Sequence, residues 1–122
     1  MLIGVDIVDI ERIKIAVERT PRFLTRVFTR GEVEYCLKKK NPYPSLAARF
    51  AAKEALRKLH PVFINGIAFH DVEVINDLDG RPQLYLHNNA LELQYKAGLA
   101  NLAISLSHAK YQAIATIIAK GG

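Results

Sequence analysis

The longest regular pattern in the chain is an alanine-rich stretch over residues 45–59, which contains no glycine, proline or β-branched residue. Such a composition predicts a helix, with Ser45 as its N-cap after a proline-rich turn. At about 100° per residue, alanines and leucines fill one side of this helix. Because that side is small and apolar, we expect another element to approach it closely.

The opposite side of the same helix is cationic. Arg49, Lys53 and Arg57 recur every four residues, where like charges repel by about 0.2–0.5 kcal/mol per pair. A bound anion would relieve that repulsion, although the spacing alone favours a solvated basic face. Glu54 lies at the margin of the apolar side, where a partly desolvated carboxylate favours a neighbouring cation. Lys58, four residues further on, is the candidate for that cation.

The start of the chain, residues 2–10, is dense in β-branched residues and predicts a strand. Asp6 and Val8 fall on one face of this strand and Asp9 on the other. Asp6 is embedded among apolar neighbours, where an unpartnered carboxylate would be costly. A buried structural hydrogen bond and a metal ligand are the two explanations, and the residues alone leave both open.

Local signals place further elements along the rest of the chain. Thr20-Pro21 resembles an N-cap followed by a first helical proline, Thr29 and Glu32 match a capping box, and Asp79-Gly80 suits a hairpin turn. The predicted elements are a helix from Pro21 that carries Arg22, Arg26 and Arg30, a helix over 30–40, a loop over 61–66, strands over 67–74 and 83–86, a helix over 90–96, and strands over 102–107 and 112–118. The fold class is α+β in a single domain, 1–122: an N-terminal strand, a helical segment with one long helix, then an antiparallel sheet.

Composition narrows the class of protein. Of 122 residues, 50% are hydrophobic and 24% charged, which excludes disordered and collagen-like chains. The net charge of +5 predicts an acidic partner: nucleic acid, anionic lipid, a phosphorylated ligand or an acidic protein. The single Cys36 cannot form an internal disulfide, and the first ten residues are too short and acidic for a signal peptide or a membrane span. We therefore expect a cytoplasmic protein.

Familiar catalytic patterns are missing from the sequence. It has no phosphate-binding glycine loop, no Cys/His metal spacing and no Gly-x-Ser-x-Gly elbow. Of four scattered histidines, only His108 stands in a polar junction between predicted strands. The basic N-terminal third is either a solvated surface or a docking surface for an acidic helix, and the four-residue repeat of its arginines leaves the two about equal.

Four collinear motifs resemble those of one known family. They are residues 4–10 (GVDIVDI), 49–55 (RFAAKEA) with Lys58, 69–74 (FHDVEV) leading to 79–82 (DGRP), and 105–108 (SLSH). Together they span essentially the whole chain, which resembles the holo-acyl-carrier-protein synthases, the small bacterial 4′-phosphopantetheinyl transferases. The resemblance implies Mg²⁺-dependent transfer of 4′-phosphopantetheine from coenzyme A to a serine of the apo acyl carrier protein of fatty acid synthesis, with release of adenosine 3′,5′-bisphosphate. It also implies the fold of that family and a homotrimer with active sites between subunits, without nucleic-acid or membrane partners.

The resemblance also implies a role for each matching residue. Asp6 and Glu54 match the metal ligands, a pair of acids that suits Mg²⁺ completed by water and substrate phosphate. Glu54 or a magnesium-bound water would take the serine proton. Lys58 and Lys53 would hold phosphate oxygens or assist the leaving group.

The remaining matches concern binding. Arg49 and His108 are expected to contact coenzyme A phosphates. Arg12, Arg22 and Arg26 fall where the family presents basic residues to the acidic helix of the carrier. Residues 59–63 (LHPVF) replace the usual Gly-Thr-Gly-like loop, so the backbone contacts to coenzyme A are expected to differ, but no metal ligand is lost.

Two other functions compete with this hypothesis. A non-enzymatic nucleic-acid-binding module would use the basic face, but the sequence contains no recognised nucleic-acid-binding motif. A catalytically silent relative is conceivable because of the altered loop at residues 59–63.

Overall fold

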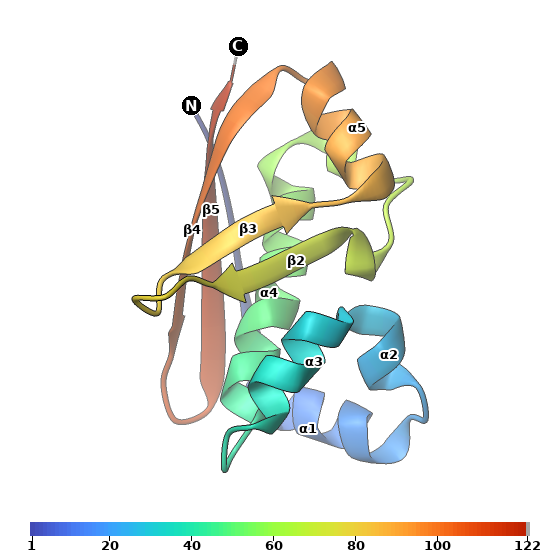
Figure 1. The fold of residues 1–122 in the computed structure, drawn as a ribbon, viewed down its shortest axis with the longest axis vertical. Coiled ribbons are helices and arrows are strands. Elements are labelled where there is room, and N and C mark those ends of the chain that lie inside the picture. The colour runs from blue at the N-terminus through green and yellow to red at the C-terminus, as the bar shows by residue number, and fades with distance from the viewer. Residues whose placement is uncertain (122) are drawn as a thin grey trace.

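The computed structural model describes residues 1–121 and centres on one helix, α4 (Tyr43–Leu59). On one side of α4 lies an antiparallel sheet in the order β1-β5-β4. On the other side lie a two-stranded hairpin and the N-terminal helices (Figure 1). The strands of the sheet are β1 (Leu2–Asp9), β4 (Leu99–His108) and β5 (Gln112–Gly121). The architecture confirms the predicted α+β class.

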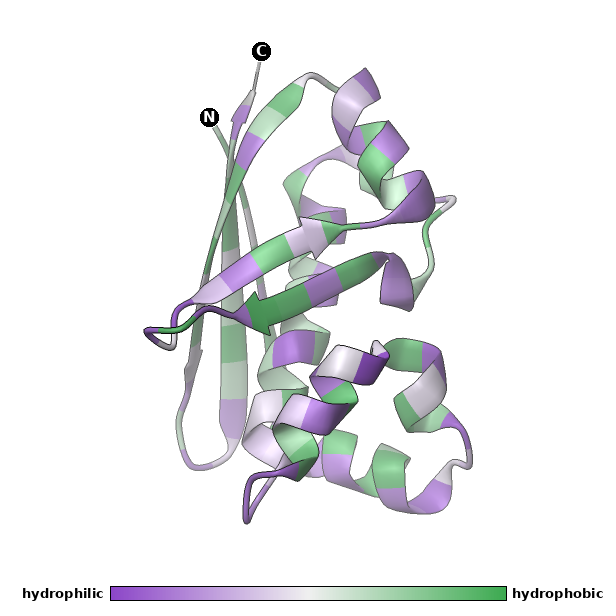
Figure 2. Cartoon of the chain, viewed as in Figure 1, coloured by the Kyte–Doolittle hydropathy of each residue, from purple (hydrophilic) through white to green (hydrophobic). Residues whose placement is uncertain are grey.

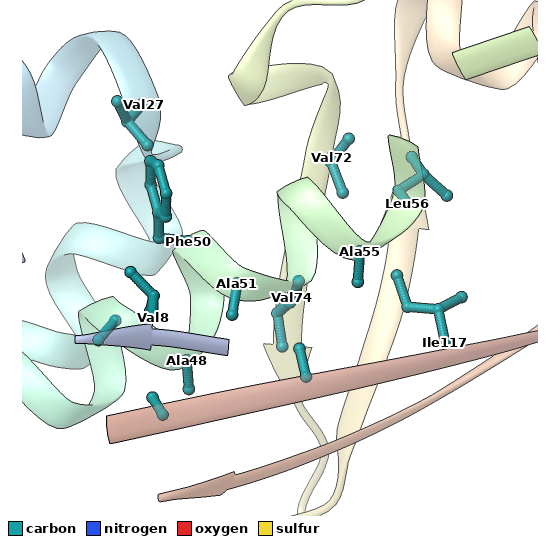
Figure 3. Close-up of a cluster of buried hydrophobic side chains, with 14 of the residues drawn as sticks. Val8, Val27, Ala48, Phe50, Ala51, Ala55, Leu56, Val72, Val74 and Ile117 are labelled. Carbon is teal, nitrogen blue, oxygen red and sulfur yellow. The ribbon is translucent and has the colours of Figure 1, made fainter. Parts of the chain in front are cut away.

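Small residues let α4 approach the sheet closely. Ala47, Ala51 and Ala55 are fully buried, and Figure 3 shows alanines of α4 facing β5. At the crossing with β1, a Cβ on Gly4 would lie 2.2 Å from the carbonyl oxygen of Ala55. Only glycine leaves room for the helix there, so the predicted close packing is confirmed.

The start of α4 differs from the prediction. The helix begins at Tyr43 after Pro42, and Ser45 lies inside the first turn instead of capping it. The backbone N–H of Tyr43 donates to Asn41 Oδ1, a bond of 3.3 Å. Pro44 fits the first turn because the N–H groups there have no intrahelical acceptor.

The N-terminal third forms three short helices, α1 (Ile10–Arg19), α2 (Phe23–Val27) and α3 (Arg30–Leu37). The N-cap prediction for Thr20-Pro21 is wrong, because the N–H of Thr20 donates to Ala16 O and closes α1, which the sequence pattern missed. The chain then turns through Arg22 at a φ of 71°. No helix runs from Pro21 through Arg30.

The capping box at Thr29 and Glu32 is confirmed, with both reciprocal hydrogen bonds present. The helix that it opens ends at Leu37, three residues before the predicted end. The lysines at 38–40 follow it as exposed residues.

The hairpin comprises β2 (Val72–Asn76) and β3 (Pro82–Leu86). The residues around its turn are mostly hydrophilic, with the exposed Leu78 among them (Figure 2). The predicted strand start at 67 is wrong, because a 3₁₀ turn, η2 (Phe69–Asp71), precedes β2. The predicted loop after α4 contains another, η1 (Pro61–Phe63).

The short helix α5 (Asn88–Lys96) follows the hairpin, with Gly98 at a φ of 71° just beyond its end. The sequence predicted that this helix starts at residue 90 with Asn88 as its cap. In the structure it starts at Asn88, and His87 occupies the N-cap position. Across residues 1–121, no helix has the length and apolar character needed to cross a bilayer.

Candidate active site

Asp6 and Glu54 both act on the ammonium group of Lys58. Asp6 points from β1 toward α4, and Lys58 Nζ donates to its Oδ1 at 2.7 Å. This hydrogen bond and the charge of Asp6 raise the pKa of Lys58, and the charge of Glu54, one helical turn earlier, adds to the effect. The direct partner of Lys58 is therefore Asp6, where the helical spacing predicted Glu54.

This group of residues is open to ligands. The side chain of Lys58 is 58% exposed and that of Asp6 is 15% exposed, while Glu54 is half-buried. An exposed ion pair contributes little to stability, because water screens both charges. The arrangement is therefore free to exchange its internal cation for another one.

The donor set suits a hard divalent cation. Within residues 1–121, no three His, Cys, Asp or Glu side chains converge as a metal-binding group. The carboxylates near Lys58 are those of Asp6 and Glu54. Two carboxylates that already attract an ammonium group fit Mg²⁺, which accepts one or two carboxylates and takes its other oxygens from water and phosphate.

Lys53 lies in the opposite direction, and its expected contact with phosphate is wrong for this fold. Its side chain is 1% exposed, and Nζ donates to Glu32 Oε1 at 2.8 Å. It also donates to the carbonyl oxygens of Phe69 and Val72. Since an ammonium has three donors, none is left for a ligand.

Glu32 completes this buried pair. Its Oε1 also accepts the N–H of Thr29, and its Oε2 accepts the N–H of Val74 at 3.0 Å. Burial lowers the pKa of Lys53, while the charge of Glu32 opposes that shift. The pair thus ties α3, α4 and β2 together. The capping box placed Glu32 at a helix start, but no sequence signal indicated its partner.

Arg49 is buried beside a small hollow. It is 3% exposed, its guanidinium lies 4.5 Å from the ring centroid of Tyr35, and Nη2 donates to Asn76 Oδ1. Within residues 1–121, its Nε is buried without a hydrogen-bond partner. The hollow has a volume of about 180 Å³ and is also lined by Ser107 and His108. The structure therefore brings Arg49 and His108 together, with Tyr35 and Asn76 as lining residues that the sequence did not indicate.

These positions overturn the hypothesis of a solvated basic face on α4. Arg49 and Lys53 are buried, and Arg57 lies 4.8 Å from the ring centroid of Phe69. The hairpin, η2 and α3 cover the cations that the helical spacing had left facing solvent.

The candidate docking residues lie on or near the short N-terminal helices. Arg12 is exposed on α1, with its guanidinium 5.9 Å from the ring centroid of Phe50. Arg22 and Arg26 are exposed at the two ends of α2, which contains no acidic residue. They form a cationic surface, but not the regular four-residue stripe of one helix that the sequence suggested.

The altered loop folds into η1. Phe63 is fully buried there, and His60 Nδ1 accepts the N–H of Val62 at 3.0 Å. A side chain thus supplies the local hydrogen bond, and the loop anchors itself in the core through an aromatic ring.

Comparison with known proteins identifies the family. Residues 2–115 match the model of the 4′-phosphopantetheinyl transferase superfamily. The chain belongs to this superfamily. A holo-[acyl-carrier-protein] synthase of Moorella thermoacetica is 42% identical over 115 residues, covering 94% of this chain and 90% of that one. The synthase of Alkaliphilus metalliredigens is 44% identical over 117 residues and 96% of both chains.

Solved structures of superfamily members share the fold. An ACPS–CoA complex of Chronobacterium ammoniagenes superposes with a TM-score of 0.86 at 30% identity, covering 99% of this chain and 97% of that one. The synthase of Neisseria meningitidis gives a TM-score of 0.82 at 28% identity over 98% and 99% of the two chains. These matches confirm the family that the motifs resemble and the fold that the resemblance implied.

Proposed function

We propose that this protein is a holo-[acyl-carrier-protein] synthase, which transfers 4′-phosphopantetheine from coenzyme A to a serine of apo acyl carrier protein in the cytoplasm. The observation that carries the proposal is the 2.7 Å contact that joins Asp6 of β1 to Lys58 of α4, one helical turn after Glu54. The relatives described above support the reaction, since they match over nearly the whole chain.

In this reaction, the serine Oγ forms a bond to the phosphorus next to pantetheine. The diphosphate P–O bond breaks, and its electron pair leaves with adenosine 3′,5′-bisphosphate. Asp6 and Glu54 would hold Mg²⁺, which when bound neutralises the diphosphate and the charge developing on the leaving phosphate. Glu54 would accept the serine proton. Lys58, more than half exposed, would turn its ammonium from Asp6 to a phosphate oxygen.

Arg49 and His108 would bind other phosphate oxygens of coenzyme A. The unpartnered Nε–H of Arg49 beside the hollow of about 180 Å³ supports this role, because a buried guanidinium donor gains most from a charged acceptor.

A homotrimer with active sites between subunits is also part of the proposal. The outward face of the sheet presents exposed Ile3, Val5 and Ile7 on β1 and Ile118 on β5. Contiguous exposed apolar surface of this kind usually marks an interface. A molar mass of three chains by light scattering is expected, and a monomer at assay concentration would contradict it.

The function is tested by incubating the protein with apo carrier, coenzyme A and Mg²⁺ and recording the carrier's mass. We expect the carrier to gain one phosphopantetheine, and a chelator to abolish the gain. An unchanged carrier mass would refute the transfer. Salt-dependent binding of duplex DNA without that reaction would favour the nucleic-acid module instead.

The docking role proposed for Arg12, Arg22 and Arg26 predicts a charge-dependent KM. Arg22→Glu or Arg26→Glu should raise the KM for the carrier by about tenfold, and the increase should depend on salt because exposed charges are screened. Lys96→Glu, the same charge change at an exposed site on α5, is the matched control and should leave KM unchanged. An unchanged, salt-insensitive KM in both arginine variants would remove the docking role.

A further inference from the structure

Arg49 carries a buried positive charge that no carboxylate of the described residues neutralises. It is 3% exposed, and among residues 1–121 none of the ion pairs within 4.0 Å includes it. Its Nη1 donates to the carbonyl oxygen of Ser45 at 3.4 Å and its Nη2 donates to Asn76 Oδ1, and both acceptors are neutral. Because a buried charge without an opposite charge is costly, the groups around Arg49 have to stabilise it in another way.

The ring of Tyr35 on α3 is one of these groups. Its centroid lies 4.5 Å from the guanidinium carbon of Arg49, within the distance of about 6 Å at which an aromatic face attracts a cation. The attraction comes from the quadrupole of the ring, which carries no net charge. Tyr35 can therefore stabilise the buried guanidinium and leave its full charge in place. Both residues line the hollow of about 180 Å³.

Asn76 on β2 supplies an amide at a point where an acid would neutralise Arg49. Its Oδ1 accepts from Arg49, and its Nδ2 donates to the carbonyl oxygen of Gly80 at 2.9 Å. An ionised carboxylate has no donor for the second of these bonds. The acid next to it, Asp77, accepts the backbone N–H of Arg81 at 2.9 Å within the hairpin turn. The amide thus fixes the guanidinium without cancelling its charge.

We infer that Tyr35 and Asn76 are positioning residues that keep Arg49 buried, oriented and fully charged for a phosphate of coenzyme A. The inference rests on the proposed function, which supplies coenzyme A as the ligand of Arg49. The Nε–H of Arg49, buried without a partner among residues 1–121, is a donor left for that phosphate. Hydrogen bonds between two charged groups are the strong ones, and neutral surroundings leave the anion without a competing carboxylate.

The main test changes the charge beside Arg49. Asn76→Asp keeps an acceptor for Nη2 but adds a negative charge, and it should raise the KM for coenzyme A by about tenfold or more with little change in kcat, as expected when ground-state binding is lost. Asn76→Ala only removes the contact and should raise this KM by about threefold. If Asn76 served the fold alone, the order would be reversed, because aspartate keeps the bond that alanine loses.

Asn101→Asp is the matched control. It makes the same chemical change at an exposed position on β4 that does not line the hollow, and it should leave the KM for coenzyme A unchanged. An equal increase in Asn76→Asp and Asn101→Asp would show a general effect of added negative charge and would overturn the inference.

A second pair of variants tests the ring. Tyr35→Leu removes the aromatic face and should raise the KM for coenzyme A by about fivefold. Tyr35→Phe keeps that face and should restore the KM to within about twofold of the parent value. Equal losses in the two variants would assign the effect to the hydroxyl group and remove Tyr35 from the inference.

Calorimetric titration of coenzyme A with Mg²⁺, without carrier, separates this inference from the proposed function. If the parent binds coenzyme A but transfers nothing to apo carrier, the proposed function fails, and the order of the Kd values of the Asn76 variants still tests the inference. An unchanged Kd in Asn76→Asp, or weaker binding by Asn76→Ala than by Asn76→Asp, would overturn the inference while the transfer stands. A parent that does not bind coenzyme A would overturn both.

Discussion

Two lysine–carboxylate pairs on α4 differ little in length but greatly in surroundings. Lys58 Nζ lies 2.7 Å from Asp6, with the lysine side chain 58% exposed. Lys53 Nζ lies 2.8 Å from Glu32, and both side chains are at most 1% exposed. Burial lowers the pKa of Lys53, whereas the carboxylate of Asp6 raises the pKa of Lys58.

The difference shows that surroundings, not distance, separate a structural pair from a reactive one. Every donor of Lys53 is used inside the protein, so that pair can only hold elements together. The Asp6–Lys58 pair lies at the surface beside a second acid and can open to admit a ligand. Adjacent residues of one helix, Lys53 and Glu54, thus serve opposite purposes because they point to different sides.

The largest expected effect comes from removing an acid of the open site. Glu54→Ala or Asp6→Ala should lower the rate of transfer by about 10³-fold or more, since several kcal/mol of charge stabilisation is lost. The circular dichroism spectrum should be retained. Glu92→Ala, an exposed acid on α5, should keep full activity as the control, and full activity in both site variants would refute the metal assignment.

Breaking the buried pair should instead affect folding. Lys53→Met leaves the Glu32 carboxylate buried without its cation and should lower the free energy of unfolding by about 3–5 kcal/mol, measured by urea denaturation. The double variant Lys53→Met with Glu32→Leu should recover most of that loss. A stable Lys53→Met protein with a raised KM for coenzyme A would restore the phosphate role predicted from the sequence.

Removing the exposed Lys58 should affect catalysis and leave stability nearly unchanged, the reverse of removing Lys53. Lys58→Ala should reduce kcat by about 10–100-fold, because one phosphate contact is lost in the transition state. Its urea unfolding midpoint should stay close to that of the parent, because exposed ion pairs add little stability. A large drop in stability without a kinetic effect would make the two pairs equivalent and break the comparison.

The smallest effect is on the pH dependence of stability. The raised pKa of Lys58 means that its contribution is complete below the ordinary lysine pKa of 10.5 and is lost as pH rises through the folded value. The lowered pKa of Lys53 has the opposite sign, so its contribution grows as pH rises toward 10.5. As pH rises through the alkaline range, the difference in unfolding free energy between the parent and Lys58→Ala should narrow, while that between the parent and Lys53→Met should widen.

Local signals in the sequence determined much of the fold. The alanine side of residues 45–59, the capping box at Thr29 and the β-branched density of residues 2–10 predicted helices and a strand where the structure has them. These features could be predicted because periodicity and capping are properties of neighbouring residues. The resemblance, which depends on motifs, also selected Asp6 and Glu54 as a pair.

Only the tertiary structure decided which charges are buried. A helical projection gives the direction in which Arg49 and Lys53 point but not what covers these side chains. The cover comes from the hairpin, whose contacts lie 27 and 19 residues further along the chain. The choice of Asp6 over Glu54 as the partner of Lys58 likewise depends on how β1 crosses α4 at Gly4. Burial and long-range pairing are set by the docking of distant segments, which local propensity does not encode.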